Sequence, residues 1–119
     1  MPEKPLEVQI FGVRKDAGTR KALRFFSERR IKTHFVDLTI RAASLGELQR
    51  FAQRFGVEAL VERNSRAFAE LRLQHSALSP ERWLQKLSEE PALLKMPLVR
   101  NGNALTLGVA EESWKSWLG

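Results

Sequence analysis

Residues 7–23, EVQIFGVRKDAGTRKAL, decide the fold of this chain. The first part, residues 7–13, is rich in β-branched and apolar side chains and predicts a strand. Apolar residues then recur at helical spacing and predict a helix over residues 17–28. A strand that leads through a tight loop into a helix is where small redox proteins place a reactive cysteine, because the helix dipole stabilises a thiolate. The chain has no cysteine, so its function does not use a protein thiol.

The middle of the chain predicts one further strand followed by helices. Residues 33–40 alternate apolar and polar side chains, which is typical of a strand. Ser44 and Glu47 form a capping box for a helix that ends at Gly56. Further helical patterns cover residues 58–73, with Asn64-Ser65 as a candidate interruption, the segment that starts at Ser79-Pro80, and a short turn over residues 91–94.

The end of the chain predicts a hairpin and a closing helix. Asn101-Gly102 lies between two apolar runs, residues 97–100 and 103–107, and is a strong short-range signal for a β-hairpin. Residues 111–118 begin with acidic side chains, and we expect their two tryptophans and the final leucine to face the core.

This order of elements predicts an α/β fold. A strand, a crossover helix and a second strand form a right-handed parallel pair, and the late hairpin must then add antiparallel strands to the same sheet. The expected architecture is a thioredoxin-like mixed sheet (β-α-β … β-β-α) with an all-helical insertion over about residues 44–94 between its halves. A chain of 119 residues is expected to form a single domain, residues 1–119.

The composition limits the classes of partner. The formal net charge of +6 favours anionic partners such as nucleic acid, acidic protein surfaces or small oxyanions, unless the basic residues only solvate helix faces. No apolar run approaches the roughly 20 residues that cross a bilayer. Residues 1–5 lack the apolar stretch of a secretory signal and predict a short disordered leader. We therefore expect a cytoplasmic protein that does not bind membranes.

Zinc and nucleic acid are not the expected ligands. His34 and His75 are the only histidines, and neither has an acidic residue or a second histidine at metal-ligand spacing. The densest basic segment, residues 14–32, has Phe25 and Phe26 as its only aromatics. Both fit a core stripe better than a base-stacking surface, so direct nucleic-acid binding is not expected.

Two segments carry a family likeness. Residues 8–23 combine a strand, a loop and a basic helix start, and residues 94–114 combine Met96-Pro97, an apolar strand, an Asn-Gly turn and a Glu-Ser-Trp stretch. Together they resemble the arsenate reductase/Spx family over roughly residues 7–118, by order and spacing more than by identities. The resemblance implies a thioredoxin-like fold in which the bond before Pro97 is cis.

The chain departs from that family in the expected active-site loop. The resemblance places the nucleophilic cysteine at Asp16, three residues before Thr19, and a common arginine at Met96, one position after Lys95. No catalytic residue is therefore expected. Asp16 is predicted to cap the helix by accepting from the N–H of Gly18 or Thr19, or else to mimic a permanent thiolate. The candidate binding residues are Arg14, Lys15, Asp16, Gly18, Thr19, Lys95 and Pro97.

Two functions follow from the resemblance. The first is a non-catalytic protein-interaction or regulatory module, because Spx-type members bind the transcription machinery through the surface of the fold. The second is an arsenate reductase-like or glutathione-dependent oxidoreductase-related enzyme, or a binder of a small anion or thiol peptide that uses Arg14, Lys15 and Lys95. Asp16 would repel an anion there, which favours the first function and a chain that is not an enzyme. No cofactor is expected from the residues themselves, and glutathione is suggested as a cofactor only by the family resemblance.

Overall fold

The computed structural model describes residues 6–73 and 77–118, and the chain divides into two compact units. The first unit is Met1–Asp37 with Met96–Gly119, and the second unit is Leu38–Lys95. The predicted helical insertion, about residues 44–94, falls inside the second unit. That both units belong to one domain stays a prediction. The predicted N-terminal leader and His75 lie outside the described residues.

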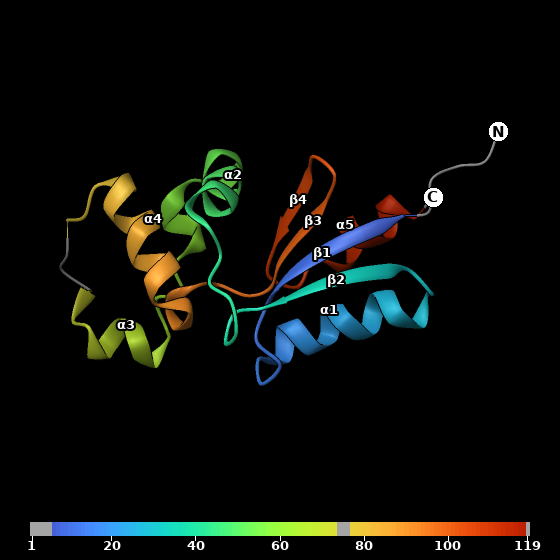
Figure 1. Ribbon diagram of the computed structural model, residues 1–119, viewed down its shortest axis with the longest axis horizontal. Helices are drawn as coiled ribbons and strands as arrows, with labels where there is room; N and C mark the ends of the chain where they lie inside the picture. Colours follow the sequence, from blue (N-terminus) through green and yellow to red (C-terminus); the bar gives the residue numbers. More distant parts are fainter. Residues whose placement is uncertain (1–5, 74–76, 119) are drawn as a thin grey trace. The chain divides into compact units, whose positions relative to one another are not determined.

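The first unit contains a four-stranded sheet with the strand order β2-β1-β3-β4 (Figure 1). The first two strands pair in parallel through a crossover helix, and the other two pairings are antiparallel, as the order of elements predicts. The elements are β1 (Glu7–Gly12), α1 (Ala17–Glu28), β2 (Lys32–Asp37), β3 (Leu98–Asn101), β4 (Ala104–Leu107) and α5 (Glu111–Trp117). The structure therefore has the expected mixed α/β fold.

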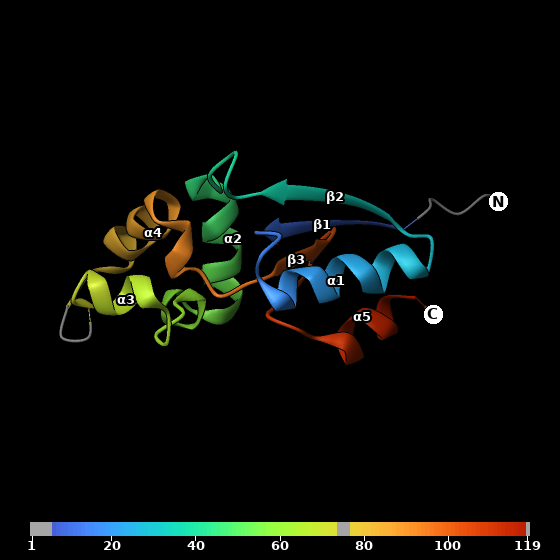
Figure 2. The same ribbon diagram turned by 90° about the horizontal axis from the view of Figure 1, so that it is seen from below.

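Helices α1 and α5 cover the same face of this sheet, as the view in Figure 2 shows. The indole N–H of Trp114 donates to the hydroxyl of Thr106 at 2.8 Å, so the buried ring keeps a polar partner. Trp117 packs at the edge of the core, whereas Leu118 is exposed because α5 ends at Trp117. One buried cluster of this unit consists of Val8, Ile10, Ala22, Phe25, Phe26, Val99 and Trp114.

Two predicted boundaries in this sheet are wrong. Strand β2 ends at Asp37 rather than at Ile40, because β1 ends at its partner Gly12 and leaves no further backbone to pair with. Ile40 is accordingly 84% exposed. The hairpin turn consists of Gly102 and the residue after it, since Asn101 still pairs within the sheet. Gly102 has a φ of 58°, which the first central position of a two-residue hairpin turn requires.

The second unit is helical in its described residues, with one isolated bridge. The predicted helix over residues 58–73 is broken earlier than expected, because Val61 forms an antiparallel bridge with Leu94 and Ser65 caps a new helix. The capping box of Ser44 and Glu47 is confirmed. The elements are α2 (Leu45–Phe55), η1 (Val57–Leu60), α3 (Arg66–Glu70), α4 (Pro80–Glu89) and η3 (Pro91–Leu93). No helix in the described part of the chain is long and apolar enough to cross a membrane.

Candidate functional site

Asp16 is the N-cap of helix α1, as predicted. Its backbone is extended (φ −80°, ψ 126°), and its Oδ2 atom accepts from the backbone N–H of Thr19 at 2.7 Å. The hydroxyl of Thr19 donates to the same oxygen at 2.9 Å. The carboxylate therefore satisfies one of the free N–H groups of the first turn and lies at the positive end of the helix dipole.

Thr19 is held in place by the end of strand β1. Its side chain is fully buried, and a Cβ atom built on Gly12 would lie 2.2 Å from the Thr19 Oγ1 atom and 2.7 Å from Cγ2. Only glycine at position 12 leaves room for this threonine. The contact orients the hydroxyl that bonds to Asp16. The sequence alone does not predict this contact role of Gly12, because no periodic pattern links the end of a strand to a residue seven positions later.

Gly18 brings the loop against a cis proline. The Met96–Pro97 peptide bond is cis, which confirms the expectation from the family likeness. A Cβ atom on Gly18 would lie 3.2 Å from the carbonyl oxygen of Met96 and 3.3 Å from Cδ of Pro97. It would also lie 3.3 Å from Oδ2 of Asp16. The structure thus gathers the capping carboxylate, Gly18 and Pro97 at one end of the sheet.

The three predicted basic residues do not all belong to the same unit. Arg14 is exposed, and its guanidinium lies 4.8 Å from the centre of the Phe35 ring. Lys15 is exposed and has no side-chain partner among the described residues. Lys95 belongs to the second unit, where its backbone N–H donates to the carbonyl of Leu60 at 2.8 Å. The loop site, which consists of Asp16, Gly18, Thr19 and Pro97, is therefore built from the first unit alone.

This arrangement fixes a negative charge where a nucleophile would be expected. Both donors of Thr19 converge on one carboxylate oxygen of Asp16, so the group is oriented by the helix start. A carboxylate cannot pass through a mixed disulfide, which needs a sulfur atom. No cluster of three or more metal-ligating side chains occurs within residues 6–73 and 77–118. The described loop therefore offers a structural cap and a surface charge.

Glu7 carries a shifted pKa at the start of strand β1. A hydrogen bond of 3.3 Å to Nε2 of His34 lowers the pKa of the Glu7 carboxyl, and Lys32, whose ammonium is 3.7 Å away, lowers it further. Both partners lie on the neighbouring strand β2, where Lys32 is the register partner of Glu7 and His34 lies two residues further along the strand. This ion-pair cluster lies at the opposite end of β1 from the loop site.

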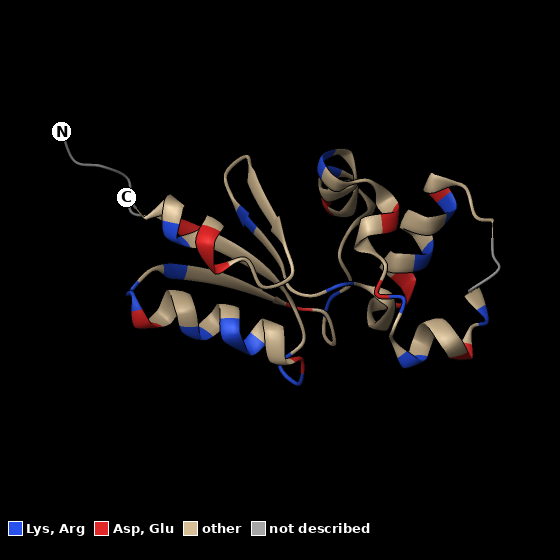
Figure 3. Cartoon of the chain, turned by 180° about the vertical axis from the view of Figure 1, so that it is seen from behind, with Lys and Arg blue, Asp and Glu red and all other residues tan. Residues whose placement is uncertain are grey.

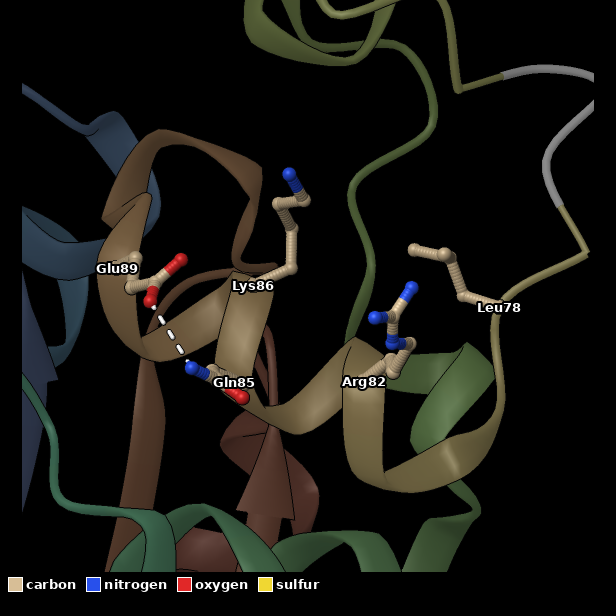
Figure 4. Close-up of a pocket in the computed structure, with 5 residues that line it drawn as sticks. All are labelled: Leu78, Arg82, Gln85, Lys86 and Glu89. Carbon is tan, nitrogen blue, oxygen red and sulfur yellow. Dashed lines mark hydrogen bonds between the residues drawn. The ribbon is translucent and has the colours of Figure 1, made fainter.

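A cavity of about 280 Å³ lies on helix α4 in the second unit (Figure 4). Arg82 and Lys86 both lie on its wall, and a hydrogen bond of 3.3 Å joins Gln85 to Glu89 beside them. None of the predicted site residues borders this cavity. The cavity therefore shares no residue with the loop site and belongs to the other unit.

Comparison with known proteins assigns the chain to a family. Residues 11–117 match the model of the ArsC family. The chain belongs to the ArsC family. This confirms the likeness in the two end segments, and the absence of cysteine makes the chain a degenerate member of that family.

Relatives of this ArsC-family chain include a regulator and several solved structures. The chain is 25% identical over 115 residues to the global transcriptional regulator Spx 2 of Oceanobacillus iheyensis, covering 95% of this chain and 84% of the relative. An arsenate reductase from Vibrio cholerae has a TM-score of 0.82 at 23% identity, with 95% of this chain and 98% of that chain covered. An arsenate reductase related protein from Brucella melitensis has a TM-score of 0.71 at 18% identity, with 98% of both chains covered. These two structures support the thioredoxin-like fold.

Proposed function

We propose that this ArsC-family chain is a non-catalytic protein-interaction or regulatory module that has lost the thiol chemistry of its relatives. The observation that supports this proposal is the state of Asp16, a carboxylate that caps helix α1 and accepts both donors of Thr19. No residue of the chain can supply a thiolate.

The chemistry of the family's reaction supports the same proposal. In the family's reactions a thiolate attacks arsenate, with loss of hydroxide or water from arsenic, or attacks a disulfide, with release of a thiol. The carboxylate of Asp16 is a poor nucleophile toward sulfur or arsenic, and its hydrogen bonds hold it against the helix start. The fold is retained without the group that carries out the chemistry.

A protein partner fits this proposal better than a small ligand. The relative from Oceanobacillus iheyensis is named a global transcriptional regulator, and the likeness supports a regulatory role for this chain. The alternative is a related enzyme or a binder of a small anion or glutathione-like peptide at the start of α1. The carboxylate of Asp16 weighs against it, because it would repel an anion at that helix end. A cytoplasmic location and the absence of direct nucleic-acid binding stay predictions.

Affinity capture from a lysate of the native cells tests the proposed function. The purified chain, immobilised through a terminal tag, should retain at least one protein in near-stoichiometric amount after washing with reductant present. Native mass spectrometry of the eluted chain should show no bound glutathione. Retention of glutathione or an oxyanion without any protein would contradict the proposal and favour the alternative.

A further inference from the structure

A charged groove runs between helices α1 and α5 of the first unit. It has a volume of about 260 Å³, and Figure 3 shows the series of basic residues along α1. Four cations and two carboxylates line the groove, namely Lys21, Arg24, Arg29, Lys115, Glu28 and Glu111. The groove therefore carries a net positive charge with acidic groups interspersed.

Arg29 is fixed in this groove before any partner arrives. Its Nη1 atom donates to the carbonyl oxygen of Phe25 at 3.0 Å, and its guanidinium carbon lies 3.7 Å from the centre of the Phe25 ring. These contacts use one nitrogen and one face of the guanidinium. The other N–H donors of the Arg29 guanidinium have no acceptor among the described residues, so they are available to bind a partner.

The neighbouring cations are only partly neutralised. The ammonium of Lys21 lies 3.5 Å from the carboxylate of Glu111 across the groove. The side chains of Arg24 and Lys115 have no carboxylate partner among residues 6–73 and 77–118. Three of the four cations are thus free to pair with acidic groups from another molecule.

We propose that the groove between α1 and α5 binds an acidic segment of a partner protein, whose carboxylates pair with Arg24 and Arg29. This deepens the proposed function, on which it rests, by naming the chemical class of the partner. Guanidinium groups match carboxylates through paired N–H donors. Because Arg29 is already ordered by Phe25, pairing with it has a smaller cost in side-chain entropy.

The lining favours a protein segment over nucleic acid. Glu28 and Glu111 lie among the cations and would repel a continuous row of phosphates, whereas a protein segment can match a mixed pattern of charge. Single-stranded nucleic acid also needs exposed aromatic rings for base stacking. Phe25 is only 5% exposed and lies under the guanidinium of Arg29.

Fluorescence anisotropy with the full chain tests this inference. The probe is a short fluorescein-labelled peptide of repeating Glu-Glu-Leu units, compared with a Gln-Gln-Leu peptide and a labelled single-stranded DNA. The test variant combines Arg24→Glu with Lys115→Glu. The matched control combines Arg82→Glu with Lys86→Glu on α4, which changes the net charge by the same amount at the separate cavity of Figure 4.

We expect the acidic peptide to bind and the test variant to weaken its binding by about tenfold or more, with the control within about twofold of the parent. Arg29→Lys, which keeps the charge but loses the paired donors, should weaken binding by about threefold. Equal loss in the control, tighter binding of the DNA, or no binding of the acidic peptide would each overturn the inference. Urea melts confirm that each variant is folded. If the groove does not bind the acidic peptide, the proposed function is still tested by the affinity-capture experiment, which does not depend on this groove.

Discussion

Thr19 donates both its backbone N–H and its hydroxyl to the same carboxylate oxygen of Asp16, at 2.7 and 2.9 Å. One side chain therefore begins helix α1 and fixes the loop that leads into it. The resemblance found in the sequence of this ArsC-family chain implies that the family's nucleophile would stand at this position. We interpret the pair as a structural replacement for a catalytic thiol.

Replacing the capping carboxylate should weaken the fold. Asp16→Ala removes the acceptor for Thr19 and the charge at the positive end of the helix dipole, so we expect a loss of roughly 0.5–2 kcal/mol in the free energy of unfolding. Asp16→Asn should lose less, because the amide oxygen still accepts from the helix N–H. Urea denaturation monitored by circular dichroism measures both. An Asp16→Ala variant as stable as the parent would show that Asp16 is not a structural cap.

Gly12 and Thr19 should show strong coupling in a double-mutant cycle. Gly12→Ala would bring a methyl group within 2.2 Å of the Thr19 Oγ1 atom, so we expect a loss of about 1–3 kcal/mol from the resulting crowding. Thr19→Ala removes the two closest atoms, and the double variant should recover part of that loss. Additive effects in urea melts would mean that the strand end and the helix start are not in contact as described.

The stability of the chain should fall in acid partly through Glu7. His34 and then Lys32 hold the pKa of Glu7 below its ordinary value in the folded state. A lowered pKa means that this contribution is complete above the unfolded pKa and is lost as the pH falls through the folded pKa. The free energy of unfolding, measured by urea melts between about pH 6 and pH 3, should therefore decrease more steeply with falling pH in the parent than in Glu7→Gln. Identical slopes of the unfolding free energy against pH in the two proteins would show that the ion pairs of Glu7 do not stabilise the fold.

The sequence predicts local elements well and close approaches poorly. The helix over residues 17–28, the cap at Asp16 and the hairpin follow from periodicity, capping and turn chemistry, which act between residues near in sequence. The break at Val61 depends on its bridge to Leu94, more than 30 residues away, and no local pattern encodes it. The fit of Thr19 against Gly12 is equally a tertiary contact. Family likeness, rather than periodicity, predicted the cis bond before Pro97.

Restoring a thiol in the loop should produce a reactive group without restoring catalysis. In Asp16→Cys the introduced thiol lies at the start of α1, close to the N–H and hydroxyl donors of Thr19. We expect these donors and the helix dipole to hold its pKa below the usual value of about 8.5. The rate of alkylation by iodoacetamide as a function of pH measures that pKa. A pKa at or above the usual value would show that the loop does not stabilise an anion at this position.

The most direct test of the central claim is arsenate turnover by the unmodified chain. The assay couples turnover to oxidation of NADPH, with glutathione and glutaredoxin supplied, and uses heat-inactivated protein as the blank. Because the chain has no cysteine to form the covalent sulfur intermediate, we predict a rate equal to the blank for the parent and for Asp16→Ala. Turnover above the blank in the parent would contradict the account, and its loss in Asp16→Ala would assign the carboxylate a chemical role.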